Sequence, residues 1–428
     1  MAAKHGDEVT FSVPLLNGDA IPNKAEAAAA ADDHASDGST SFLKTCLNCL
    51  NALSGVGILS IPYALASGGW LSLILLFIIA MATFYTGVLI KKCMDMNLGI
   101  KSYPDIGHHA FGEKGRFAVS ITMYTELYLV ATGFLILEGD NLDNIFPNTV
   151  VELAGLSVGG KQFFVILIGL VIMPSVWLDN LNLLSYVSAS GVFASVIIIC
   201  SIFWTATVDG TGFHHSGTLL NWDGIPTSVS LYAFCYCAHP VFPTLYNSIR
   251  KKPQFSNVLL MCFVLSTFGY ASMAIFGYLM FGSDVQSQIT LNLPINKLSS
   301  KVAIFTTLVN PIAKYALMVT PIKNALKDLL PGTYQNRITN ILISSALAIS
   351  TVMVALTIPF FGYLMSLVGA ILSVTASILL PCLCYLKISG TYKKCCFETV
   401  VIIGIISTGL VIGIFGTYTS VLKIIEHW

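Results

Sequence analysis

The sequence predicts an all-α integral membrane protein with about eleven membrane-spanning helices. Composition is the first indication, because 55% of the 428 residues are hydrophobic and only 10% are charged, too few charges to keep a globular domain of this size in solution. The second is a series of apolar stretches of about 20 residues, the length that crosses a bilayer. The third is that lysine and arginine concentrate in alternate connecting segments.

The amino-terminal segment differs from the rest of the chain. Residues 1–40 contain no apolar run and are rich in Ala, Asp, Ser and Gly. This composition predicts a disordered cytosolic tail rather than a secretory signal. Residues 41–428 are then expected to form one transmembrane domain.

The apolar stretches define the expected spans in chain order. Each is long enough to cross the hydrocarbon layer, and the fourth is the shortest. We predict spans at residues 42–66, 70–90, 117–138, 162–178, 183–206, 226–249, 257–281, 300–322, 338–358, 361–386 and 398–421.

Charge sets the expected orientation, because cytosolic segments are enriched in lysine and arginine. With the amino terminus in the cytosol, the outer segments hold only Lys161, Lys297, Lys301 and Lys423. An odd number of spans then places the carboxyl terminus outside or in a lumen. The inner segments hold Lys91, Lys92, Lys101, Lys114, Arg116, Arg250, Lys251, Lys252, Lys323, Lys327, Arg337, Lys387, Lys393 and Lys394.

Spans 1 and 6 are both interrupted near their middle. The first contains Ser54-Gly55-Val56-Gly57, and the sixth contains Pro240 and Pro243. Proline removes a backbone donor and glycine weakens a helix, so both stretches are expected to unwind. Broken helices at matching depth, five spans apart, predict two inverted repeats, spans 1–5 and 6–10, with span 11 added.

An unwound stretch frees backbone groups for a ligand. The half-helix that begins after Gly57 presents N–H groups and the positive end of its dipole, which suit a carboxylate. The last carbonyls before the break suit a cation or an ammonium group. A zwitterionic α-amino acid matches this pair of sites. Asn51 precedes the break by one turn, and its amide is expected to bind substrate or ion, or only to support the neighbouring span 8.

Three ionisable residues lie near mid-membrane, where such residues usually have a function. We expect Lys314 to bond carbonyls of span 1 in the place of a sodium ion, so that its proton is the coupled ion; snorkelling to the cytosolic face is the alternative. Glu126 is expected to pair with Lys314 or to take the proton itself, unless it is a neutral, hydrogen-bonded acid. Tyr128 is a further candidate, facing the site to cap the substrate. His239 is expected to sense an acid compartment, or simply to satisfy loose carbonyls.

In four stretches the chain resembles the amino acid/auxin permease (AAAP) family, and most of all its plant vacuolar amino acid transporters. These are NALSGVGILSIPYALASGGW at 51–70, SYPDIGHHAFGEKGR at 102–116, CYCAHPVFPTLYNSI at 235–249 and NPIAKYAL at 310–317. The resemblance covers nearly all of residues 41–428. It implies a LeuT-like fold of the APC superfamily, secondary transport of amino acids, proton coupling and a vacuolar membrane.

The resemblance also implies site residues. The asparagine that helps to bind sodium in sodium-coupled relatives matches Asn51, whereas Lys314 argues against sodium coupling here. No cofactor, metal or nucleic acid is expected, and the oligomeric state is not predicted. The implied substrate site comprises Ser54, Gly55, Val56 and Gly57 in span 1 and Cys235, Tyr236, Ala238 and His239 in span 6.

The predicted function is therefore secondary active transport of neutral amino acids across the vacuolar membrane, coupled to protons. Exchange against luminal protons would load the vacuole and is favoured; symport would empty it through the same residues. A membrane sensor that binds an amino acid and signals through residues 1–40 is an alternative. An intramembrane enzyme is not expected, because the spans contain no HExxH motif and no paired aspartates.

Overall fold

The computed structural model describes residues 40–426, apart from 98, 154–155, 178–183, 332–335, 359 and 394–396. The predicted tail lies outside this part up to residue 39, so its disorder stays a prediction.

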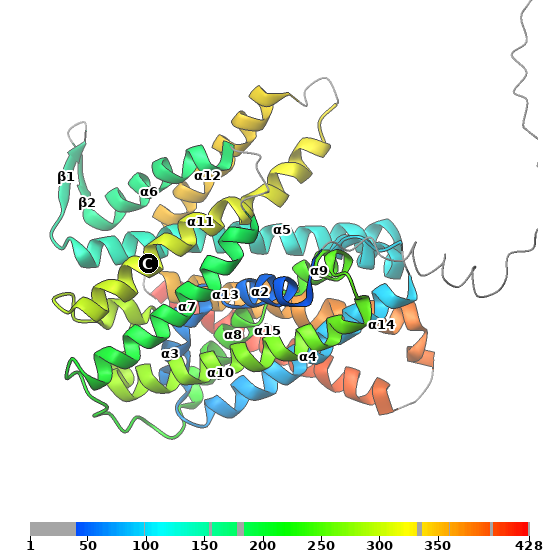
Figure 1. Cartoon of the computed structure of the whole chain (residues 1–428), viewed down its shortest axis with the longest axis horizontal. Helices are drawn as coiled ribbons and strands as arrows, with labels where there is room; N and C mark the ends of the chain where they lie inside the picture. Colours follow the sequence, from blue (N-terminus) through cyan, green and yellow to red (C-terminus); the bar gives the residue numbers. More distant parts are fainter. Residues whose placement is uncertain are drawn as a thin grey trace, which may run out of the picture.

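The described part is almost entirely helical (Figure 1). One antiparallel hairpin interrupts the helices in the predicted outer segment after span 3, formed by β1 (Val150–Leu153) and β2 (Leu156–Gly159). The helices are α2 (Phe42–Leu53), α3 (Gly57–Gly68), α4 (Ser72–Met96), α5 (Tyr103–Ile145), α6 (Gly160–Trp177), α7 (Leu184–Thr207), α8 (Ile225–Cys235), α9 (Phe242–Ser248), α10 (Phe255–Phe281), α11 (Leu298–Asp328), α12 (Arg337–Thr357), α13 (Phe361–Val368), α14 (Leu380–Ser389) and α15 (Phe397–Glu426).

These helices confirm a membrane-spanning architecture. Within the residues that the structure describes, nine helices are long and apolar enough to cross a bilayer, and α2 with α3, bent by 49°, makes ten. The predicted sixth span is divided into α8 and α9 by a 3₁₀ turn at His239–Val241, so neither piece alone has the length of a span. Both interruptions expected from glycine and proline are therefore present.

Both predicted ends of span 3 need correction. Span 3 was expected at residues 117–138, but α5 runs from Tyr103 to Ile145 and includes much of the expected loop. It bends at Gly112, whose positive φ of 67° a side chain would disfavour. Its beginning is fixed by Asp105, whose carboxylate accepts the Ser102 N–H at 2.9 Å in a capping box.

The tenth span is continuous but distorted. Between α13 and α14 the chain forms two π-helical segments, Gly369–Ser373 and Thr375–Leu379. Such widened turns leave carbonyls free and occur most often at functional sites. This span is also deeply buried: 61% of its most apolar window lies inside the protein, against 22% for α15. The low value for α15 agrees with a helix added outside the two repeats.

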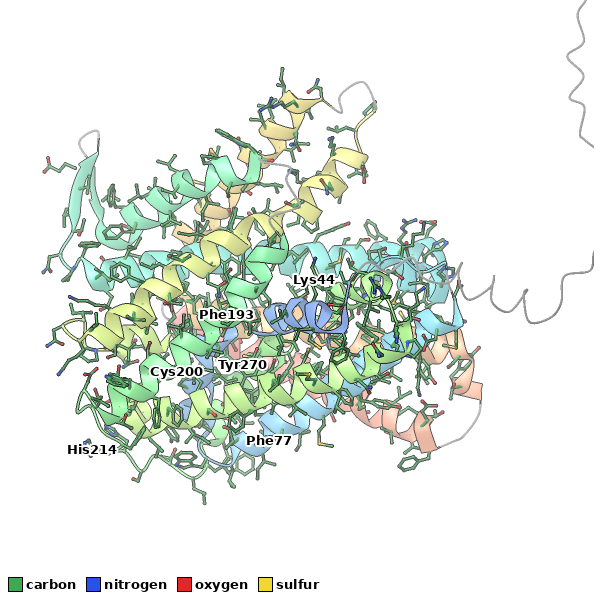
Figure 2. All side chains as sticks on the ribbon, in the orientation of Figure 1. Lys44, Phe77, Phe193, Cys200, His214 and Tyr270 are labelled. Atoms are coloured by element: carbon green, nitrogen blue, oxygen red, sulfur yellow. The ribbon has the colours of Figure 1, made fainter. Side chains whose placement is uncertain are left out.

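Apolar side chains cover the outside of the bundle as well as its core. Phe77 of α4 and Phe193 of α7 are 46% and 66% exposed, and Phe77 points away from the bundle at its lower edge, whereas Tyr270 of α10 lies near the middle (Figure 2). A soluble protein rarely exposes so much apolar surface. The broken helices lie inside this shell, with α3 packed against α8 and α10.

Candidate functional site

Helix 1 is the broken span formed by α2 and α3, and helix 6 is the broken span formed by α8 and α9. A buried lysine of a neighbouring helix contacts the break of helix 1. Lys314 of α11 is only 4% exposed, and its ammonium group donates to the carbonyls of Asn51 at 3.2 Å and Ser54 at 3.1 Å. The predicted contact between Lys314 and span 1 is thus present, and the ammonium does not snorkel to the surface. Its role as a substitute for a cation remains a prediction.

Tyr270 contacts the carbonyl of Leu53, which lies between Asn51 and Ser54 in the chain. Its buried hydroxyl donates to Leu53, the last residue of α2, and lies 3.0 Å from the carbonyl of Cys235, the last residue of α8. One side chain of α10 therefore links the ends of both broken helices. No sequence pattern pointed to this role, because a single tyrosine in an apolar span is usually a packing residue.

The other side of the helix 1 break offers donors. No side chain caps the start of α3. The N–H groups of Ile58 and Leu59 bond the carbonyls of Gly55 at 3.4 Å and Val56 at 3.1 Å, which leaves the N–H groups of Val56 and Gly57 without a hydrogen-bond partner in the described part of the chain. The hydroxyl of Ser54 and the amide oxygen of Asn51 are buried without a hydrogen-bond partner in the described part of the chain. Unsatisfied polar atoms at a helix start favour a polar ligand.

The two breaks touch each other at Gly57. A Cβ atom at Gly57 would lie 2.7 Å from Sγ and 3.2 Å from Cα of Cys235. Only a glycine allows this approach without displacing helix 6. The predicted site residues Gly57 and Cys235 are thus brought together.

The cavity beside the break is small. It lies between helix 1, α7 and α11 and measures about 10 Å³, room for about one water molecule. Side chains must therefore move before an amino acid enters. The lining residues are Gly55, Val56, Ile58, Leu59, Ser195, Ile198, Thr307, Asn310 and Pro311.

Glu126 lies next to the other break and does not pair with Lys314. It is 6% exposed, its carboxyl oxygen accepts from Ser373 of the π-helical segment at 2.6 Å, and the side chain of Cys237 faces it. No Glu126–Lys314 ion pair occurs among the described residues, so the expected pairing is wrong for this conformation. Depth in the membrane predicted how far along its span each residue lies, but not the direction in which its side chain points from the helix.

Tyr128 is also placed differently from the expectation. Its hydroxyl donates to Ser350 of α12 at 3.0 Å. The side chain is therefore engaged with α12, and nothing in this contact supports a role as a cap over the substrate.

His239 satisfies a carbonyl of α4. Its Nε2 lies 3.0 Å from the Thr83 carbonyl and 2.9 Å from the Thr86 hydroxyl. Because a carbonyl only accepts, Nε2 carries a hydrogen. The ring packs on Phe242, 4.8 Å between centroids, and Nδ1 is buried without a partner in the described part. The Thr83 carbonyl lies within the regular helix α4 and not at the break, so this contact is not the one with loose carbonyls that the alternative described, and the role of His239 as a pH sensor stays a prediction.

Tyr236 and Ala238 contribute to the break through their backbone. The Tyr236 ring stacks on Phe263, and its hydroxyl bonds Thr267 of α10 at 2.8 Å. Ala238 is 2% exposed. The Tyr236 side chain is thus committed to packing in this conformation.

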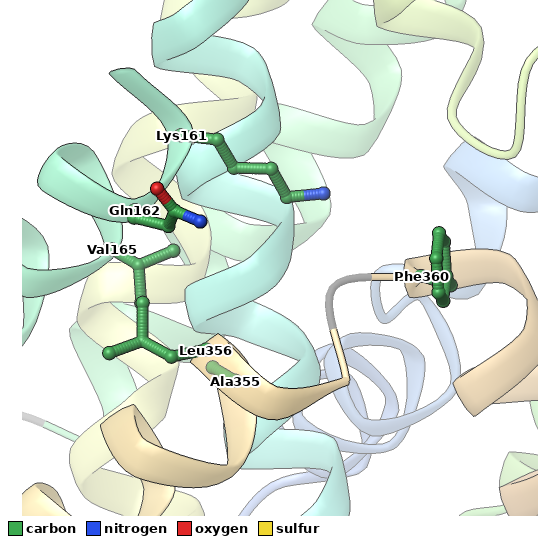
Figure 3. A pocket seen from close by; sticks show the side chains of 6 residues that line it. All are labelled: Lys161, Gln162, Val165, Ala355, Leu356 and Phe360. Carbon is green, nitrogen blue, oxygen red and sulfur yellow. The ribbon is translucent and has the colours of Figure 1, made fainter. Parts of the chain in front are cut away.

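A larger cavity of about 300 Å³ lies at the predicted outer end of the bundle. Lys161 and Phe360 stand on opposite sides of it (Figure 3), and the Lys161 ammonium forms an ion pair with Asp140 of α5. None of its lining residues belongs to the two breaks: they are Lys161, Gln162, Val165, Ala355, Leu356 and Phe360.

Solved structures with a similar fold are transporters. A Na⁺-coupled sialic acid symporter in its substrate-bound outward-open state aligns with a TM-score of 0.53 at 11% identity, covering 88% of each chain. MhsT in complex with L-phenylalanine aligns with a TM-score of 0.55 at 11% identity, covering 87% of this chain and 98% of that one. These likenesses confirm the LeuT-like fold with its broken helices.

Sequence relatives are far more similar. Amino acid transporter AVT1I of Arabidopsis thaliana is 60% identical over 91% of this chain and 96% of its own length. Amino acid transporter AVT1J of the same plant is 61% identical over 92% and 93%. The relatives and the fold are those of transporters rather than enzymes. Residues 38–422 match the family described as transmembrane amino acid transporter protein, and the chain therefore belongs to that family.

Proposed function

We propose that this protein is a secondary active transporter of neutral α-amino acids in the vacuolar membrane, coupled to protons and working by antiport. The observation that carries the proposal is the ammonium group of Lys314 on the carbonyls of Asn51 and Ser54. These carbonyls are freed by the break, and a monovalent cation would otherwise have to satisfy them.

A lysine in this position makes sodium unnecessary. A buried amine either keeps its charge through polar partners or loses its proton. In this conformation the two carbonyls favour the charged form. Loss of the proton would replace the ammonium by a neutral amine, whose N–H groups are weaker donors, and would weaken the hydrogen bonds to the carbonyls of Asn51 and Ser54 that hold helix 1 closed. The protonation of Lys314 and the conformation of the helix 1 break are thus linked.

The substrate would bind across both breaks. Its carboxylate would accept from the N–H groups of Val56 and Gly57, which have no hydrogen-bond partner in the described part, and from the hydroxyl of Ser54, where the helix dipole is positive. Lys314 and Tyr270 already bond the carbonyls of helix 1. The α-ammonium group would therefore use the Cys235 carbonyl, whose second lone pair is available beside its contact with the shared Tyr270 hydroxyl. The side-chain amide of Asn51, one turn before the break, would complete the substrate site.

The proposed membrane compartment and the direction of amino acid transport are supported by other observations. The resemblance to vacuolar amino acid transporters suggests the compartment, and the lysine and arginine distribution suggests a cytosolic amino terminus and a luminal carboxyl terminus. With an acid lumen, exchange against protons would concentrate amino acids there. Symport out of the lumen would use the same groups.

Purified protein in liposomes tests the proposal. Vesicles with an acid lumen receive labelled neutral amino acids outside, with and without a proton ionophore, and the orientation of the inserted protein is measured in parallel. We expect uptake that collapses with the ionophore. Accumulation only with the reversed gradient would replace antiport by symport. Absence of gradient-driven movement in either direction would overturn the transporter and favour a sensor.

A further inference from the structure

Each broken helix has one buried ionisable group as a neighbour. Lys314 contacts the carbonyls of helix 1, and Glu126 lies against Cys237 in the linker of helix 6. The two groups form no ion pair with each other or with another described residue. Their protons are therefore held by separate parts of the protein.

Lys314 requires its proton in this conformation. Two carbonyls share its ammonium group, and no acidic side chain within the described residues compensates the charge. A neutral amine could still donate to both, but its hydrogen bonds would lack the charge that strengthens those of the ammonium. The closed break of helix 1 thus favours the protonated lysine.

Glu126 requires a proton for the opposite reason. The groups that face its carboxyl are the Ser373 hydroxyl and the Cys237 side chain, with Tyr103 of the same helix as the other titratable neighbour. None of these is a cation. An ionised carboxylate that is buried without a cation is strongly disfavoured, so the closed arrangement favours the neutral acid.

Both partners of Glu126 belong to segments that deviate from regular α-helix. Cys237 lies between α8 and the 3₁₀ turn, and Ser373 ends the first π-helical segment. An opening of helix 6 that draws Cys237 away and admits water would stabilise the carboxylate. The proton on Glu126 would leave as the break opens.

His239 and Glu138, two other buried titratable side chains of these spans, show no such link. His239 keeps a hydrogen on Nε2 for Thr83 and needs no second one. Glu138, nearer the carboxyl end of α5, is fully buried, but neither of its carboxyl oxygens has a hydrogen-bond partner in the described part. No contact therefore ties the Glu138 proton to a broken helix.

We propose that the transport cycle moves two protons per amino acid, one on Lys314 at helix 1 and one on Glu126 at helix 6. This rests on the proposed function, since it specifies the stoichiometry and the second proton-binding group of the same transporter. In the return step without amino acid, each break would close only when its own group is protonated, so both protons cross the membrane together and the amino acid crosses in the other step.

The limiting accumulation of substrate measures the stoichiometry. With the membrane potential clamped at zero in proteoliposomes, each coupled proton multiplies the final concentration ratio by about ten per pH unit. We expect about a hundredfold per pH unit for the wild type and about tenfold for Glu126→Gln. Exchange of labelled for unlabelled amino acid at equal pH, which needs no net proton movement, should persist in this variant. Glu152→Gln, at an exposed position on β1, is the matched control.

The possible results separate a failure of the two-proton cycle from a failure of the proposed function. A wild-type ratio of about tenfold per pH unit would overturn the two-proton cycle and leave the transporter proposal intact. An unchanged slope in Glu126→Gln would also overturn it. A wild type that accumulates no amino acid at any gradient would overturn the proposed function itself. If Glu126→Gln does not fold, the wild-type slope still decides.

Discussion

The two broken helices are completed in different ways. Helix 1 unwinds at glycines, and side chains of α10 and α11 supply the donors for its carbonyls. In helix 6, N–H groups of the linker itself bond the carbonyls of Ala233, Phe234 and Tyr236. Local N–H groups also bond the carbonyls of Leu53 and Gly55 at the first break, but the carbonyls of Asn51 and Ser54 depend on distant Lys314. In the second break, within the described residues, only the Cys235 carbonyl receives a distant side chain, that of Tyr270. Substitutions in α10 and α11 should therefore act strongly on helix 1, and polar side chains of helix 6 should matter less for its shape.

Removal of Lys314 should have the largest effect. Lys314→Ala leaves two buried carbonyls without a donor, at about 1–3 kcal/mol each. We expect exchange and gradient-driven uptake in liposomes to fall by about 100-fold or more. Lys301→Ala, exposed on the same helix, is the control. A Lys314→Ala protein that still concentrates substrate on a proton gradient would show that helix 1 does not depend on α11.

The contact between the breaks gives the next largest effect. Gly57→Ala places a Cβ 2.7 Å from Sγ and 3.2 Å from Cα of Cys235. The thiol can rotate, but the backbone must shift, and overpacking of this kind costs about 1–3 kcal/mol. We expect about tenfold slower exchange, and a smaller loss for Gly55→Ala, where a Cβ meets nothing within 4 Å. Equal losses in both variants would mean that the breaks need not approach closely.

The sequence predicted the fold far better than the partners within the site. Apolar stretches, glycines and prolines identify spans and breaks because membrane solvation constrains every backbone group. The Lys314 contact followed from the same argument, since freed carbonyls need a donor. Pairing of Glu126 with Lys314 was wrong because depth says nothing about the direction of a side chain around its helix. Tyr270 was missed because its role depends on packing between spans far apart in sequence.

Tyr270→Phe should have a moderate effect that sharpens the comparison further. The change keeps the ring but removes the hydroxyl shared by the carbonyls of Leu53 and Cys235. One lost hydrogen bond costs about 0.5–1.5 kcal/mol. We expect several-fold slower exchange, with a larger rise in KM than fall in maximal rate, because the Cys235 carbonyl belongs to the proposed ammonium site. Tyr418→Phe, at a residue 64% exposed on α15, should behave as wild type. A loss confined to maximal rate would place Tyr270 in the movement of the helices rather than in binding.

His239→Gln should have the smallest effect, and it tests the claim that helix 6 is satisfied locally. A glutamine amide can donate to the Thr83 carbonyl as Nε2 of His239 does, and it carries no titratable proton. If the histidine only serves this carbonyl, the pH dependence of uptake should keep its midpoint, while a small loss of rate reflects the missing contact with Phe242. The measurement is initial uptake across a pH series for both proteins in the same liposomes. A displaced midpoint in His239→Gln would mean that the unpartnered Nδ1 takes up a proton during the cycle, and helix 6 would then have its own pH sensor besides Glu126.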